Sequence, residues 1–288
     1  NRGQFPDDGL YRLHGKGKSI SDWRRDNITR FVSKLYSKVK EIKPWVQVSS
    51  APLGRYRALN DRGRGWTAHE TVFQDAGKWM KLGIHDALYP MMYYKDELFY
   101  PYLDDWIINS NNRILVPGLG AYQMIELKWL LNDITNQVDY SRNKKVHGQA
   151  YFRTENVLSN TNGILHSLNN YYKTPAKLPP MVWLSDSIPN RPFNISAEKN
   201  EEGLFELRWE SADDDSRVTY NVYRSATDDF STDNAHNIIA IGLKEPYFSY
   251  NAENNDLAFY YYITVSDSFH NESEISIPAF FYHSDTVK

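Results

Sequence analysis

Hydrophobic positions in the first 190 residues follow helical and strand spacing in turn. From residue 21 to 43 apolar side chains recur every three or four positions, which predicts a helix capped by Ser21 and ended by Pro44. The side chains on that face are Ile28, Phe31, Val32, Leu35, Val39 and Ile42. A second helix is predicted between Thr67 and Gly83.

The start and end of that second helix carry recognisable capping residues. Thr67 and Glu70 have the spacing of a capping box. Gly83 stands where a glycine commonly ends a helix. We therefore expect the helix to begin directly after Thr67 and to carry its apolar residues between 72 and 80.

Four apolar runs alternate with the predicted helices. They lie at about residues 45–51, 86–94, 113–122 and 145–154. Further helices are expected near 102–109, 126–140 and 161–172. Because the runs are continuous and each precedes a helix, they predict parallel strands buried on both faces. The N-terminal part is therefore predicted to be about four parallel βα units.

A different pattern begins after a proline-rich stretch at 178–193. Short runs rich in aromatic and β-branched residues, separated by Asn, Asp and Gly turns, predict a β-sandwich of about seven strands. We expect two domains, at 1–190 and 191–288.

The second domain resembles a fibronectin type III module. Trp209 stands at the position of the core tryptophan, NVYRS (221–225) is similar to the third strand, and FYYYITVSDSFHNES (259–273) is similar to the penultimate strand and its turn. We expect Phe259, Tyr261, Ile263 and Val265 to face inward, with Tyr261 as the tyrosine-corner residue. Another seven-stranded sandwich is the alternative.

Composition narrows the possible functions. The chain has 33 Lys and Arg against 36 Asp and Glu, a formal net charge of −3, which does not favour a nucleic-acid partner. No apolar run approaches the ~18 residues of a membrane span. The absence of cysteine excludes disulfides and thiolate metal sites. The eight histidines show no metal-binding spacing and no nucleotide-binding loop is present, so we expect no metal and no cofactor.

Candidate binding residues cluster where the predicted parallel strands end, because ligands bind at the carboxyl ends of such strands. Aromatic, arginine and glutamine side chains at these ends suit a sugar-binding cleft. Adjacent strand residues face opposite sides, so Tyr93 and Tyr94 cannot both point into the cleft. An ion pair is an equal alternative for Arg153. The candidates are Arg55, Tyr56, Tyr93, Tyr94, Tyr122, Gln123, Phe152 and Arg153.

A catalytic pair of carboxylates is not evident. Glycoside hydrolysis normally needs two carboxyl groups roughly 5–9.5 Å apart. Asp96 and Glu155, the acids near the predicted strand ends, are the only candidates for a catalytic role, and simple solvation is the alternative for both. Asp104 and Asp105 are explained by the N-terminal preference of acids in a short helix. The catalytic residues therefore stay unknown.

Several motifs, in order, resemble the bacterial glycosyl hydrolase-like 10 family, whose members include hydrolases of peptide-free peptidoglycan glycans and are typically exported proteins or lipoproteins. The similarity extends over about residues 5–185. The motifs are FPDDGLY (5–11), SDWRRDNITRFV (21–32), KPWVQVSSAPLGRYR (43–57), VFQDAGKWMKLGIHDALYPMMYY (72–94), VPGLGAYQ (116–123), GQAYFRTENVL (148–158) and PPMVWL (179–184).

The resemblance implies a (β/α)8 barrel of which this chain has the C-terminal half. In the family, the paired aspartates expected to be catalytic precede the FPDD motif, so no residue here inherits their role, including Asp7 and Asp8. Met91 and Arg55 depart from the residues common in the family. The positions that match the family's binding residues are Pro52, Gly54, Tyr56, Pro90, Tyr93, Tyr94, Gly118, Gly120, Tyr122, Phe152 and Arg153.

Two functions follow as expectations. The first is a fragment of a glycoside hydrolase, inactive alone, that supplies the aromatic and arginine side of a cleft for cell-wall glycan or another polysaccharide. The alternative is a non-catalytic glycan-binding or surface-interaction protein. Export to the periplasm or cell surface as a lipoprotein is implied by the resemblance. A half barrel would expose sheet edges, so self-association through those edges is also expected.

Overall fold

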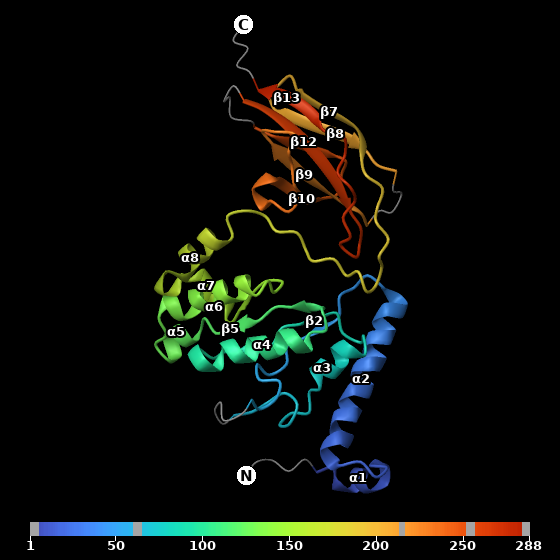
Figure 1. Ribbon diagram of the computed structural model, residues 1–288, viewed down its shortest axis with the longest axis vertical. Helices are drawn as coiled ribbons and strands as arrows, with labels where there is room; N and C mark the ends of the chain where they lie inside the picture. Colours follow the sequence, from blue (N-terminus) through green and yellow to red (C-terminus); the bar gives the residue numbers. More distant parts are fainter. Residues whose placement is uncertain (1–5, 60–64, 213–216, 252–256, 284–288) are drawn as a thin grey trace. The chain divides into compact units, whose positions relative to one another are not determined.

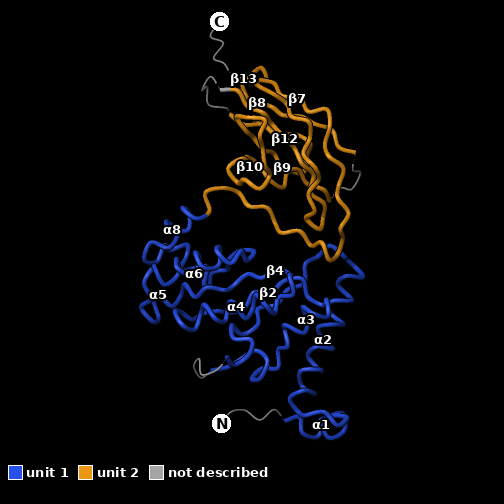
Figure 2. Tube along the Cα trace, viewed as in Figure 1, with its two compact units in different colours: residues 1–171 blue, residues 172–288 orange. Residues whose placement is uncertain are grey.

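The computed structural model describes residues 6–59, 65–212, 217–251 and 257–283. It divides into two compact units, Asn1–Tyr171 and Tyr172–Lys288, called unit 1 and unit 2 below. Figure 1 identifies the helices and strands and Figure 2 colours the two units. No helix in the described part of the chain is long and apolar enough to cross a membrane.

Unit 1 begins with a helical hairpin, α1 (Asp8–His14) and α2 (Ile20–Ile42). The cap of α2 is Ser19, whose Oγ accepts a hydrogen bond from the Asp22 N–H at 3.1 Å. The prediction of Ser21 as the cap was wrong because Ser21 already has a place inside the first helical turn. The apolar face is only partly covered, since Val32 is buried but Phe31 is 66% exposed.

The parallel strands of unit 1 are shorter than the apolar runs that predicted them. They are β1 (Ser49–Ser50), β2 (Ala87–Leu88), β3 (Met91–Met92), β4 (Ile114–Leu115), β5 (Gly118–Leu119) and β6 (Ala150–Tyr151). They pair in the orders β1-β2-β4 and β3-β5-β6, parallel throughout. A further parallel bridge joins Leu53 to Met91.

Prolines at equivalent places interrupt three of these runs. Proline has no N–H to donate, yet its carbonyl still accepts a hydrogen bond from the next strand. Met91 donates to Pro52 at 2.9 Å, Gly118 to Pro90 at 2.8 Å, and Ala150 to Pro117 at 3.0 Å. The parallel register therefore continues through the interruptions.

Helices follow the strands as predicted, with bounds that differ from the expected ones, and short helices that were not predicted lie between them. They are α3 (Ala76–Lys81), η1 (Asp96–Leu98), α4 (Tyr100–Asn109), α5 (Gln123–Glu126), α6 (Leu131–Asn143), α7 (Thr154–Leu158), η2 (Thr161–Gly163) and α8 (Ile164–Tyr171). Thr67 and Glu70 do bond to each other, but they close a turn ahead of α3 rather than start it. Phe73, with a φ of 59°, interrupts the helical backbone between Glu70 and the start of α3. Gly83, with a φ of 73°, ends the helix as predicted.

Consecutive helices of unit 1 pack in chain order, α2 against α3, α3 against α4 and α4 against α6. The buried core between them and the strands includes Trp79, Met92, Trp106 and Leu119. The mixture of helices and strands is thus confirmed. A half (β/α)8 barrel is not established by these strands and stays a prediction.

Unit 2 consists of two antiparallel sheets, of strand order β10-β9-β12-β13 and β11-β8-β7. The strands are β7 (Phe193–Lys199), β8 (Phe205–Glu210), β9 (Thr219–Ser225), β10 (Ile238–Leu243), β11 (Tyr247–Tyr250), β12 (Leu257–Ser266) and β13 (Ala279–His283), with η3 (Ala235–Asn237) before β10. These two antiparallel sheets agree with the predicted β-sandwich.

The core of unit 2 lies between its sheets. Trp209 is 4% exposed, and Tyr261, Ile263 and Val265 are fully buried. Phe259 packs partly buried against them, so the predicted inward-facing set is confirmed. The hydroxyl of Tyr261 lies 2.8 Å from that of Tyr250.

The proline-rich segment before β7 is held against the sheets of unit 2. Met181 is fully buried and donates its N–H to the Phe269 carbonyl at 2.8 Å. Lys177 Nζ forms an ion pair with Glu272 at 2.6 Å. The segment is therefore an ordered part of unit 2.

Candidate functional site

Three aromatic side chains from the ends of β3, β5 and β6 form one group. The rings of Tyr93 and Phe152 are stacked, with centroids 5.2 Å apart and an interplanar angle of 18°. Tyr122 meets both rings edge-on, at 5.6 Å from Tyr93 and 5.5 Å from Phe152. We call these three residues the aromatic group. Phe152 is 46% exposed, so part of the group faces solvent.

Backbone pairing brings the three rings together. The Phe152 N–H donates to the Leu119 carbonyl at 2.9 Å, and the Tyr122 N–H donates to the Phe152 carbonyl at 3.0 Å. A Cβ on Gly120 would lie 3.2 Å from the Cβ of Tyr93, which is tighter than ordinary packing. The glycine therefore lets Tyr93 approach the loop that carries Tyr122.

Polar side chains flank the aromatic group. The Arg153 guanidinium lies 5.6 Å from the centroid of Tyr122 and donates to Glu126 Oε1 at 2.8 Å. The Gln123 amide donates to the Tyr122 hydroxyl at 3.0 Å. Burial raises the pKa of the Tyr93 and Tyr122 hydroxyls above the ordinary tyrosine value of 10.0. Both hydroxyls are therefore protonated at neutral pH, as tyrosines usually are, and can donate hydrogen bonds.

Arg55 and Tyr94 lie together, and a third residue joins them. The Arg55 guanidinium is 5.0 Å from the centroid of Tyr94 and 5.4 Å from that of Tyr102. Arg55 is only 6% exposed, so two aromatic faces cover this cation inside the unit. Tyr93 faces the aromatic group while Tyr94 faces Arg55, as the alternation of strand residues requires.

Tyr56 lies in the core. It is 2% exposed, its hydroxyl donates to Asp75 Oδ1 at 2.6 Å, and its ring packs 5.2 Å from Trp106. Burial raises its pKa, and the hydrogen bond to Asp75 adds to that effect. The structure thus places Tyr56 among packing residues, apart from the exposed aromatic group.

The two acids near the strand ends are both exposed. Asp96 begins η1 with a φ of 52°, and Glu155 lies in the first turn of α7. Among the described residues, no group of three His, Asp or Glu side chains is placed to hold a metal ion. The site therefore offers stacking surfaces and hydrogen-bond donors.

Sequence reasoning gave two residues too little weight. Glu126, the partner of Arg153, lies 27 positions away in the chain, and no local pattern links the two. Asp105 lies inside α4, where burial raises the pKa of its carboxyl group. Its Oδ1 accepts from the Asn109 amide at 3.0 Å, and this i, i+4 spacing was the available signal.

Comparison with known proteins identifies relatives. Residues 3–112 match the glycosyl hydrolase-like 10 family. Glycosyl hydrolase YngK of Bacillus subtilis (strain 168) is 27% identical over 299 residues, which cover 95% of this chain and 58% of YngK. Glycosyl hydrolase DigH of Escherichia coli (strain K12) is 26% identical over 171 residues, which cover 52% of this chain and 39% of DigH.

Among solved structures, an Fn3-like protein from Clostridium thermocellum aligns with 33% of this chain and 92% of its own, at 23% identity and a TM-score of 0.28. The chain spans about 58% of the length of YngK and 39% of that of DigH. The resemblance to the glycosyl hydrolase-like 10 family is confirmed by the family match and by these two relatives.

Proposed function

With residues 3–112 matching the glycosyl hydrolase-like 10 family, we propose that this chain forms part of a glycoside hydrolase acting on cell-wall glycan or another polysaccharide. The aromatic group with Arg153 forms one side of its substrate cleft. The single observation that carries the proposal is the meeting of Tyr93, Tyr122 and Phe152 at the carboxyl ends of parallel strands.

The chemistry of this surface suits a sugar. Aromatic rings cover the apolar face of a pyranose, while neutral hydroxyls and the Gln123 amide bond to its hydroxyl groups. Arg153 adds a charged donor at the edge, in exchange for its surface ion pair with Glu126, which costs little to open because both side chains are half exposed.

A second function, glycan binding without hydrolysis, is favoured by the exposure of Asp96 and Glu155. A catalytic acid in a glycosidase usually has its pKa raised by burial, and an exposed carboxyl group lacks that environment. Under this proposal the aromatic group binds polysaccharide and the chain cleaves none.

One experiment separates the two proposals. The full chain, and the same chain extended by whatever its gene encodes upstream, are mixed with peptide-free peptidoglycan glycan and with a panel of soluble polysaccharides, and both binding and the release of reducing ends are measured. Release by either version supports the hydrolase, and binding by both versions without release supports the binding protein. Phe152→Ala should weaken binding about tenfold, whereas Phe280→Ala, at another exposed phenylalanine, in unit 2, should leave it unchanged. Equal binding by both variants and the parent would contradict the role of the aromatic group.

Two further expectations remain proposals. We propose that the protein acts outside the cytoplasm, at the cell surface or in the periplasm. We also propose self-association through the outer strands of the parallel sheets, β1 and β6, aided by the exposed Phe31 and Leu35 side chains of α2. Light scattering after size-exclusion chromatography tests the second point, since a monomer at all concentrations would exclude it.

A further inference from the structure

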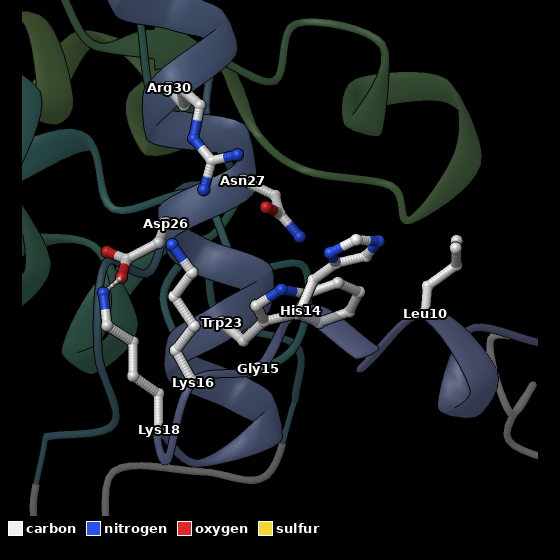
Figure 3. A pocket seen from close by; sticks show the side chains of 9 residues that line it. All are labelled: Leu10, His14, Gly15, Lys16, Lys18, Trp23, Asp26, Asn27 and Arg30. Atoms are coloured by element: carbon white, nitrogen blue, oxygen red, sulfur yellow. Dashed lines mark hydrogen bonds and ion pairs between the residues drawn. The ribbon is translucent and has the colours of Figure 1, made fainter. Parts of the chain in front are cut away.

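A hollow of about 690 Å³ lies between α1 and the first half of α2, within unit 1. Figure 3 shows the side chains that line it. They are Leu10, His14, Gly15, Lys16, Lys18, Trp23, Asp26, Asn27 and Arg30. None of these residues belongs to the aromatic group or to the residues that flank it.

The frame of this hollow is fixed by contacts between the two helices. Asp7, directly before α1, accepts two hydrogen bonds from the Arg24 guanidinium, at 2.9 and 2.6 Å. These bonds lower the pKa of the Asp7 carboxyl group. The Tyr11 hydroxyl donates to the Lys18 carbonyl at 2.5 Å, and its ring packs 5.7 Å from Trp23. These contacts therefore hold α1 and α2 in the arrangement that forms the hollow.

The charges around the hollow do not balance. Asp26, its one acid, is already paired with Lys18 and, at 3.2 Å, with Lys78. For the Lys16, Asn27 and Arg30 side chains, no hydrogen bond or ion pair with another described residue is present. In Figure 3 the charged ends of Lys16 and Arg30 point toward each other across the opening. Two cations thus face the same hollow, and the carboxylate of its one acid, Asp26, is already paired with other lysines.

We propose that this hollow binds an oxyanion, a carboxylate or a phosphate group, carried by an acidic polysaccharide. Arg30 forms a forked pair with the oxyanion, and Lys16 supplies a second charge. Trp23 and Leu10 provide the apolar wall against which the attached sugar packs. The assignment to a polysaccharide rests on the proposed function, whereas oxyanion binding itself does not.

Titration of the full chain, labelled with 15N and followed by NMR, tests the proposal. The probes are trigalacturonate, inorganic phosphate and the neutral trisaccharide maltotriose. We expect saturable shifts of the Trp23 indole and Asn27 amide signals with at least one anion and none with maltotriose. A response to trigalacturonate alone identifies a carboxylated glycan, a response to phosphate alone identifies a phosphate-bearing one, and a response to both supports the shared oxyanion chemistry.

Variants decide whether the named residues act. Arg30→Gln and Lys16→Gln should each raise the Kd at least about fivefold. Lys81→Gln removes the same charge from an exposed lysine outside the hollow and should leave the Kd unchanged. The proposal is overturned if neither anion shifts the two signals, if maltotriose shifts them equally, or if the three variants bind alike. A negative result here concerns only the hollow. Polysaccharide binding by the aromatic group is tested independently by Phe152→Ala.

Discussion

Each unit contains a pair of stacked aromatic rings, and the two pairs differ in exposure. In unit 2, Phe205 and Tyr261 stack with centroids 4.6 Å apart, and both are fully buried. In unit 1, Tyr93 and Phe152 stack at 5.2 Å, yet Phe152 is 46% exposed. A similar ring geometry therefore serves packing in one unit and leaves a surface open in the other.

The surroundings of the pairs explain the difference. Phe205 contacts the rings of Tyr250 and Phe281 as well as Tyr261, so strands from both sheets enclose it. Phe152 follows the end of β6, and its ring contacts Tyr93 and Tyr122 while nearly half of the side chain stays exposed. Aromatic content alone, at 15% of the chain, does not separate these roles. The position of Phe152 at the end of a strand, compared with that of Phe205 within β8, separates the two roles.

The largest expected effect comes from truncating the buried pair. Phe205→Ala should lower the free energy of unfolding of unit 2 by about 3–5 kcal/mol, because it leaves a cavity between the sheets. Phe152→Ala should change the stability of unit 1 by less than about 1 kcal/mol. Urea denaturation followed by near-UV circular dichroism measures both. Equal losses would show that the exposed pair is a packing element.

The next effect concerns the polar centre of unit 2. Glu272 accepts from Lys177, Thr264 at 2.6 Å and the Tyr223 hydroxyl. Burial alone would raise the pKa of Glu272, but these donors outweigh it and lower the pKa below its ordinary value of 4.5. A lowered folded-state pKa stabilises the protein above the unfolded-state pKa, and that stability is lost as the pH falls through the folded-state value.

We therefore expect Glu272→Gln to destabilise unit 2 by about 2 kcal/mol at pH 7, with a smaller loss at pH 3. Thermal unfolding at both pH values measures the difference. Glu274→Gln, an exposed acid two residues along the same segment, is the control. A loss that is the same at both pH values would mean that the Glu272 charge is not what Lys177 and its neighbours stabilise.

A smaller effect tests the start of α2. Ser19→Ala should cost unit 1 about 1 kcal/mol, because the Asp22 N–H loses its acceptor. Ser21→Ala should cost nothing, since alanine is favourable inside a helical turn. The helical circular dichroism signal on heating compares the two. The reverse order would restore Ser21 as the cap.

The smallest stability effect is expected at the edge of the aromatic group. Arg153→Gln breaks an ion pair with Glu126 in which both side chains are half exposed, so stability should change by about 0–1 kcal/mol. Polysaccharide binding should weaken about fivefold, because a charged donor beside Tyr122 is lost. Calorimetry reports the two changes separately. A loss of stability without a loss of binding would assign Arg153 to structure alone.

The order of helices and parallel strands, the change to antiparallel strands, and the inward set around Tyr261 were predictable from the sequence. Each depends on periodicity or on apolar runs within a few residues. The Ser19 cap was missed because Ser21 has the same local preference. That Thr67 and Glu70 close a turn before α3 could not be predicted without the backbone conformation of Phe73. The core position of Tyr56 could not be predicted without its partner, Asp75.

The sequence by itself thus determined which elements form, in which order, and the family to which residues 3–112 are similar. Only the tertiary structure decided that Tyr93, Tyr122 and Phe152 meet, that Arg55 is covered by two tyrosines, and that Arg153 pairs with Glu126. The physical reason is range. Helix and strand patterns arise from neighbours in the chain, whereas the exposure of a ring and the partner of a charge depend on residues brought close by packing.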